Sequence, residues 1–213
     1  EGYALPVSDG SARNRSGIRT AMKALHDAGY TAQDGTMRDA NGKALRFRIL
    51  LSKGSTENMA IAELYIQALK RLGVEATVEA VDDAQFVSRN AEFDFDMAIF
   101  RRALSLSPGN EQRYYWGSEA ADQPGSRNLM GVKSPAIDAM IDTMVNATTT
   151  QDFIAATRAL DRVLTAGRYV VPFWQFTQDR IAHITEMKYP DHVPLYGDGP
   201  NYMPEVWWIE AER

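Results

Sequence analysis

Hydrophobic and polar residues alternate along two short segments of the chain, and a third short apolar segment follows them. Residues 46–51 and 74–81 carry the alternation, and residues 95–100 are the third segment, so three β-strands are predicted. Residues 55–72 and 84–90 lie between them and place apolar side chains at helical spacing. This β-α-β-α-β order predicts a mostly parallel sheet with right-handed crossovers, flanked by helices.

Further elements are predicted on both sides of this unit. They are helices at 16–28, 134–144 and 151–166, and strands at 169–176, 180–184 and 206–209. Residues 1–14 read as a loop or linker. Because no other linker is evident, residues 15–213 are expected to form a single α/β lobe.

The composition is that of a globular protein without a strong charge bias. The 213 residues are 45% hydrophobic, and 23 Lys and Arg against 28 Asp and Glu give a net charge of −5. Nucleic acid is therefore not expected as the partner, since phosphate binding needs a concentrated positive face. The absence of cysteine excludes disulfides, thiolate metal sites and cysteine nucleophiles. The first residues lack a signal-peptide pattern, so a targeting segment would have been removed or would lie outside this sequence.

A long Gly- and Pro-rich segment, residues 101–133, follows the third predicted strand. Ligands of open parallel sheets bind beyond the carboxyl ends of the strands, and long connections of this kind are usually functional or disordered. Its aromatic residues favour burial over disorder. We expect this segment to contact a ligand through arginines, small polar groups and aromatic faces. The candidates are Arg101, Arg102, Ser105, Asn110, Glu111, Tyr114, Trp116, Arg127 and Asn128.

For each of these candidates a structural role is the alternative. The aromatic residues could anchor the segment to the core, and the arginines could be solvated. Trp174 and Gln175, at the end of a predicted strand, are expected to line the same cleft, with core packing as their alternative. The sequence alone leaves these alternatives open.

The sequence contains no recognisable catalytic or metal-binding motif. His26, His183 and His192 lack the spacing of metal ligands, so neither a metal nor a cofactor is expected. Asp94 and Asp96 would point to the same side of a strand. We interpret them as structural, the alternative being a pair of acid and base carboxylates.

Several motifs occur here in an order that resembles a known family. A helix ends at Ala28-Gly29-Tyr30, Asp34-Gly35 follows, and Asn41-Gly42-Lys43 precedes a strand. Leu72-Gly73-Val74 and the sequence FDFDMAIF come next, and GRYVVPFWQFT comes later. This series resembles the second lobe of family 5 extracellular solute-binding proteins, the dipeptide-, oligopeptide- and nickel-type binding subunits of ABC importers. Residues 105–135 are most similar to the YejA-like branch.

The resemblance implies a lobe of the type II periplasmic binding protein fold. This chain would be the C-terminal lobe of a two-lobed periplasmic protein more than twice as long. The resemblance further implies a monomeric receptor, peripheral to the membrane and not an enzyme, that delivers a peptide or peptide-like ligand to the transmembrane subunits of an ABC permease. A ligand-sensing domain of a regulator and a hydrolase are the alternative functions.

One departure from the family pattern bears on the ligand. Peptide-binding members place an Asp shortly after the strand that matches residues 95–100, where it holds the ligand's amino group. This sequence has Arg101 and Arg102 there and no acid before Glu111. The two arginines lead to the hypothesis of an anionic or carboxylate-bearing ligand, or of binding directed at the ligand's backbone.

Overall fold

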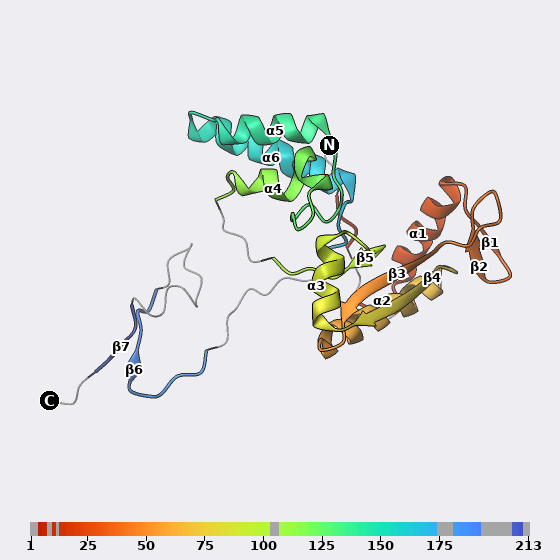
Figure 1. Ribbon diagram of the computed structural model, residues 1–213, viewed down its shortest axis with the longest axis horizontal. Helices are drawn as coiled ribbons and strands as arrows, with labels where there is room; N and C mark the ends of the chain where they lie inside the picture. The colour runs from red at the N-terminus through yellow and green to blue at the C-terminus, as the bar shows by residue number, and fades with distance from the viewer. Residues whose placement is uncertain are drawn as a thin grey trace. The chain divides into compact units, whose positions relative to one another are not determined.

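The computed structural model describes residues 4–7, 10–11, 13–102, 107–173, 181–192 and 206–210 (Figure 1). The chain divides into two compact units. Unit 1 comprises Glu1–Arg102 and Gly109–Tyr169, and unit 2 comprises Ala103–Pro108 and Val170–Arg213. Each unit is described by itself, and the single lobe over residues 15–213 stays a prediction.

The centre of unit 1 is a three-stranded sheet with the order β4-β3-β5. The strands are β3 (Arg46–Ser52), β4 (Glu75–Val81) and β5 (Met97–Ala98), and both neighbouring pairs are parallel. The predicted parallel sheet is confirmed, but its third strand is shorter than predicted. The carboxylate of Asp96 accepts a hydrogen bond from the Arg48 N–H at 2.9 Å, so a side chain replaces the backbone where this ladder would begin.

Two helices connect these strands, as the hydrophobic pattern predicts. They are α2 (Thr56–Lys70) and α3 (Asp83–Ala91), and Asp82 caps α3 by accepting the Gln85 N–H at 2.9 Å. Ala62 of α2 packs on Ile49 and Leu51, and all three are buried. With this strand order, right-handed crossovers place α2 and α3 on opposite faces of the sheet.

A helix and a hairpin precede the sheet. The helix is α1 (Arg15–Asp27), and the hairpin pairs β1 (Thr31–Gln33) with β2 (Thr36–Arg38). Met37 from the hairpin is buried against Leu72 and Val74. Gly73 has φ +74°, and a Cβ atom there would lie 2.9 Å from backbone atoms of the hairpin. Only glycine fits this close approach of two segments.

The Gly- and Pro-rich segment 101–133, in which no helix or strand is predicted, contains two short helices where the structure describes it. They are α4 (Glu111–Trp116) and the 3-10 helix η1 (Ser118–Asp122). A helical hairpin follows, formed by α5 (Pro135–Val145) and α6 (Thr150–Gly167), as the sequence predicts. Its apolar faces meet in a core that includes Val132. The sequence does not predict these two helices because neither is long enough to show a helical period of apolar residues.

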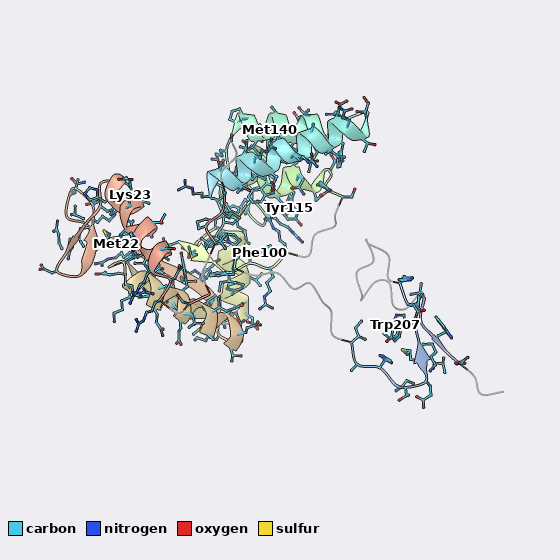
Figure 2. The ribbon with its side chains drawn as sticks, turned by 180° about the vertical axis from the view of Figure 1, so that it is seen from behind. Met22, Lys23, Phe100, Tyr115, Met140 and Trp207 are labelled. Atoms are coloured by element: carbon cyan, nitrogen blue, oxygen red, sulfur yellow. The ribbon has the colours of Figure 1, made fainter. Side chains whose placement is uncertain are left out.

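In unit 2, the described residues contain one antiparallel pair, β6 (Met187–Lys188) with β7 (Trp208–Ile209). Tyr189 stacks on Trp207, the residue labelled in Figure 2, with 4.8 Å between ring centroids. The strand predictions at 169–176 and 180–184 are wrong for their described parts, residues 169–173 and 181–184. No strand is assigned to these described residues, and an apolar run by itself does not specify a ladder partner.

Over the described ranges, none of the helices combines the length and the apolar character needed to cross a bilayer.

Candidate functional site

The candidate site lies at the carboxyl edge of the unit 1 sheet. Residues 99–102 continue from β5 at this edge. The strand β3 ends at the same edge because it runs parallel to β5, and α2 begins shortly after it. The sheet therefore brings the first turn of α2 next to Arg101, at the edge where open parallel sheets bind ligands.

Arg101 points toward the first turn of α2. Its Nη2 is 2.7 Å from Oε2 of Glu57 and 3.5 Å from Oδ1 of Asn58. The side chains of Arg101 and Glu57 are 58% and 57% exposed, so both charges face solvent. A ligand at this edge would meet a guanidinium already paired with a carboxylate.

Arg102 is half-buried among aromatic rings. Its Cζ lies 3.9 Å from the ring centroid of Tyr115, 5.2 Å from that of Trp116 and 5.5 Å from that of Phe100. Figure 2 labels Phe100, which follows β5, and Tyr115, which lies in α4. The Nη2 of Arg102 also donates a hydrogen bond to the carbonyl of Arg127 at 2.9 Å.

These contacts give Arg102 a positioning role. Burial, together with the nearby charge of Arg127, lowers the pKa of Arg102 from its ordinary value. A guanidinium stays protonated at neutral pH even so, and stacking on aromatic faces stabilises the cation. Arg127 in turn donates to the Tyr115 hydroxyl at 3.1 Å. Arg102 thereby joins the end of β5 to α4 and to the loop at residue 127.

The short helix α4 presents its predicted site residues in different ways. Tyr114 is 43% exposed and donates a hydrogen bond to the Gly125 carbonyl at 2.9 Å, whereas Trp116 packs against the core of α5 and α6. Asn110 and Glu111 are exposed at the amino-terminal end of the helix. Tyr114, Asn110 and Glu111 can therefore reach a ligand, but Trp116 is mainly a packing residue.

Glu111 is held by local hydrogen bonds. Its Oε1 accepts the Gly109 N–H at 2.8 Å and the Gln112 side-chain amide at 3.1 Å. Partial burial raises the pKa of this carboxyl, but the hydrogen bonds outweigh it and the net pKa of Glu111 is lowered. Glu111 is therefore ionised at neutral pH and poorly suited to act as a general acid.

Asn128 does not lie on a surface that a ligand can reach. Its side chain is fully buried, donates to the carbonyls of Gly117 and Val132 at 3.0 and 2.9 Å, and accepts the Val132 N–H at 2.9 Å. The structure thus does not support the predicted ligand contact at Asn128. Its amide group instead fixes the loop before α5.

A second polar group holds α4 and η1 onto α5. Asp138, in the first turn of α5, accepts the N–H of Ser118 at 2.8 Å and its hydroxyl at 2.6 Å. The Ser118 hydroxyl oxygen accepts the N–H of Ser134 at 3.0 Å. This group positions the segment that follows the candidate site, and no sequence pattern predicts it. Glu57 was also missed, and its only signal is its place in the first turn after a strand.

The paired aspartates of the hydrolase alternative lie in an ion-pair network on the sheet. Asp94 is 2.7 Å from Nε of Arg89, and Asp96 is 3.4 Å from Nε of Arg48. Glu79 contacts both arginines at 2.8 and 3.0 Å, and the hydrogen bond from Arg89 lowers its pKa. These contacts agree with the structural interpretation of Asp94 and Asp96. No cluster of potential metal ligands occurs within the part of the chain that the structure describes.

Three of the predicted site residues lie outside the described residues. They are Ser105, Trp174 and Gln175.

Solved structures of binding proteins have a similar fold. The oligopeptide-binding protein AppA of Bacillus subtilis, in complex with a nonapeptide, has a TM-score of 0.64 and 19% identity, over 71% of this chain and 30% of that chain. NikZ of Campylobacter jejuni, in complex with Ni(L-His), has a TM-score of 0.62 and 16% identity, over the same shares of the two chains. These likenesses confirm the predicted α/β fold of a periplasmic binding protein lobe.

Curated sequence relatives have a higher sequence identity to this chain than these solved structures have. The "Probable peptide-binding protein YejA" of Agrobacterium fabrum is 39% identical over 207 residues, which are 97% of this chain and 33% of the relative. The "Peptidoglycan-binding protein YepA" of the same organism is 38% identical over 206 residues, with shares of 97% and 32%. The chain thus spans about a third of the length of these curated relatives.

The family comparison agrees with the resemblance. The family described as "Bacterial extracellular solute-binding proteins, family 5 Middle" matches residues 3–124, which is more than half of the 213 residues. The predicted resemblance to this family and to its YejA-like relatives is confirmed. The chain therefore belongs to family 5 of the bacterial extracellular solute-binding proteins.

Proposed function

We propose that this chain is the C-terminal lobe of a two-lobed periplasmic receptor that binds a peptide or peptide-like ligand for an ABC importer. The observation that carries the proposal is the parallel sheet whose carboxyl edge presents Arg101 and Arg102, in a chain 39% identical to a "Probable peptide-binding protein". The chain's share of about a third of the relatives' length supports a second lobe elsewhere in the polypeptide.

The ligand class rests on the sequence relatives rather than on the fold. Proteins of this fold have been solved with a nonapeptide, with Ni(L-His) and with stachyose, so the fold by itself leaves the ligand open. The relatives at 38–39% identity are named for peptides and for peptidoglycan, a polymer that carries short peptides. A peptide or a peptide-bearing fragment fits both names.

The proposed mechanism is closure of two lobes around the ligand. Contacts from both lobes favour the closed state, which then docks on the transmembrane subunits of the permease. In this lobe Arg101 binds an acidic group of the ligand, and Arg102 holds the end of β5 against α4. Asn110, Glu111, Tyr114 and Arg127 are proposed as further contacts because their side chains are exposed. No bond is made or broken, so the receptor needs no catalytic group.

Neither alternative function gains support from the site. A hydrolase would need unpaired acid and base carboxylates, but Asp94 and Asp96 are bound to arginines and Glu111 to its neighbours. A regulator would carry a helix-turn-helix segment in the remaining polypeptide, whereas a receptor would carry a signal peptide. The gene sequence upstream of this segment distinguishes the two.

The proposal is tested with the full-length receptor. Native mass spectrometry of the purified protein identifies the ligand that remains bound, and calorimetry then measures its affinity for variants. Arg101→Ala is expected to weaken binding by about tenfold or more, because a charge-assisted contact is lost. A purified receptor that carries no peptide-containing ligand and binds none, or an Arg101→Ala variant of unchanged affinity, contradicts the proposal.

A further inference from the structure

The carboxyl edge of the sheet carries a carboxylate beside the proposed ligand-binding arginine. Glu57 and Arg101 are 44 positions apart in sequence, yet their charged groups are 2.7 Å apart. They meet because β3 and β5 are parallel neighbours, so the helix after one strand starts where the other strand ends. The fold itself therefore determines this pairing.

The pair is built differently from the ion pairs that hold the sheet. Arg101 and Glu57 are both more than half exposed, whereas Arg89 and Glu79 are 18% and 33% exposed and share two contacts of 2.8 and 3.2 Å. An exposed pair contributes little to stability because water screens both charges. The Arg101–Glu57 pair can therefore open at little cost to the fold, which leaves it available for a role in binding.

We infer that Glu57 is a specificity-determining residue that competes with acidic groups of the ligand for Arg101. The inference rests on the proposed function. A ligand carboxylate that binds Arg101 either takes the place of Glu57 at Nη2 or binds beside it, and in both cases it lies close to the negative charge of Glu57. A neutral ligand group leaves the pair intact. Glu57 thus weakens the binding of carboxylate ligands relative to their neutral counterparts.

Three variants isolate this competition in the full-length receptor. Glu57→Gln removes the negative charge and keeps the shape and the hydrogen-bonding oxygen. Glu63→Gln is the matched control, because Glu63 is exposed on the same helix and loses the same charge. The double variant Glu57→Gln with Arg101→Ala shows whether the effect of Glu57 passes through Arg101.

The probe is a random peptide library prepared in two forms, with free carboxyl termini and with carboxamide termini. Each receptor is mixed with both forms and washed, and the retained peptides are counted by mass spectrometry. Glu57→Gln is expected to raise the ratio of retained acids to amides by about fivefold over the parent receptor, the size expected for an exposed ion pair. Glu63→Gln should change this ratio by less than about twofold, because the charge it removes is screened by water.

The outcomes separate the inference from the function on which it rests. A parent receptor that retains neither library overturns the proposed peptide function, and the inference with it. A parent receptor that retains peptides while Glu57→Gln leaves the ratio unchanged overturns the inference alone. A rise that persists in the Arg101→Ala background also overturns it, because the effect would then not pass through Arg101.

Discussion

Replacing Asn128 with alanine removes three hydrogen bonds from the interior of unit 1. The side-chain amide donates to the carbonyls of Gly117 and Val132, and its oxygen accepts the Val132 N–H. The Gly117 carbonyl keeps a second donor, the N–H of Ala120 at 3.1 Å. The loss therefore falls mainly on the N–H and the carbonyl of Val132, a residue that is 1% exposed.

The size of the effect follows from these two groups. A buried polar group left without a partner costs about 1–3 kcal/mol, so the two groups at Val132 give a loss of about 2–6 kcal/mol in the free energy of unfolding. The void left by the side chain adds to this loss. For a chain of this length each kcal/mol lowers the melting temperature by roughly 2–4 °C, so Asn128→Ala is expected to melt at least several degrees earlier.

Chemical denaturation followed by circular dichroism measures the loss, and hydrogen exchange at the Val132 amide locates it. The control is Asn146→Ala, which removes an exposed bond to the Asp142 carbonyl and should change stability by less than about 0.5 kcal/mol. Asn128→Asp keeps the acceptor for Val132 but loses both donated bonds, so it should also be destabilised. A loss below about 1 kcal/mol for Asn128→Ala, with Val132 still protected, would refute the structural role.

Three further predictions concern the polar contacts around the sheet and the site. Arg102→Lys should destabilise the chain by about 1–2 kcal/mol, because Arg102 stacks its planar group on aromatic rings. Arg101→Lys should cost less than about 0.5 kcal/mol, because its ion pair with Glu57 is exposed; equal thermal shifts would count against this. The pKa of Glu79 is lowered in the folded state, so its stabilising contribution is present above the pKa of an unfolded Glu and is lost as pH falls through the folded pKa. Acid titration should show this loss of stability in the parent chain and a smaller loss in Glu79→Gln. Ser118→Ala should cost about 1–3 kcal/mol in urea denaturation, because Asp138 and the Ser134 N–H each lose a partner; a neutral result would contradict the positioning role.

The hydrophobic pattern was sufficient to predict the central elements of unit 1. Strands β3 and β4 and helices α2, α5 and α6 appear where the alternation and the helical spacing place them. Each buries one face or stripe of side chains, and burial of this kind produces a period in the sequence. The predictions at 169–173 and 181–184 failed because an apolar run gives no information about its ladder partner.

The candidate site was only partly predictable, because contacts between distant segments leave no local pattern. The carboxyl edge and the arginines at its start followed from the order of the elements. The partner of Arg101 is 44 residues away, and the partners that bury Asn128 depend on how the loop folds back before α5. The sequence pattern around a polar residue in an aromatic-rich segment is the same whether its side chain faces a ligand or is buried in the core.

Arg101 and Arg102 show how the fold separates two residues that the sequence presents as equivalent. Successive side chains of an extended segment point to opposite sides, so adjacent arginines after β5 cannot both face the same neighbour. One reaches the solvent-exposed first turn of α2, and the other enters the aromatic group of α4. Alternation predicts that the two roles differ but does not say which residue has which role. That depends on the side of the strand on which α4 packs, and this packing is fixed by the buried polar contacts of Asn128 and Asp138. The arginine proposed to face the ligand is thus selected by hydrogen bonds in the segment after α4, including those of the buried Asn128.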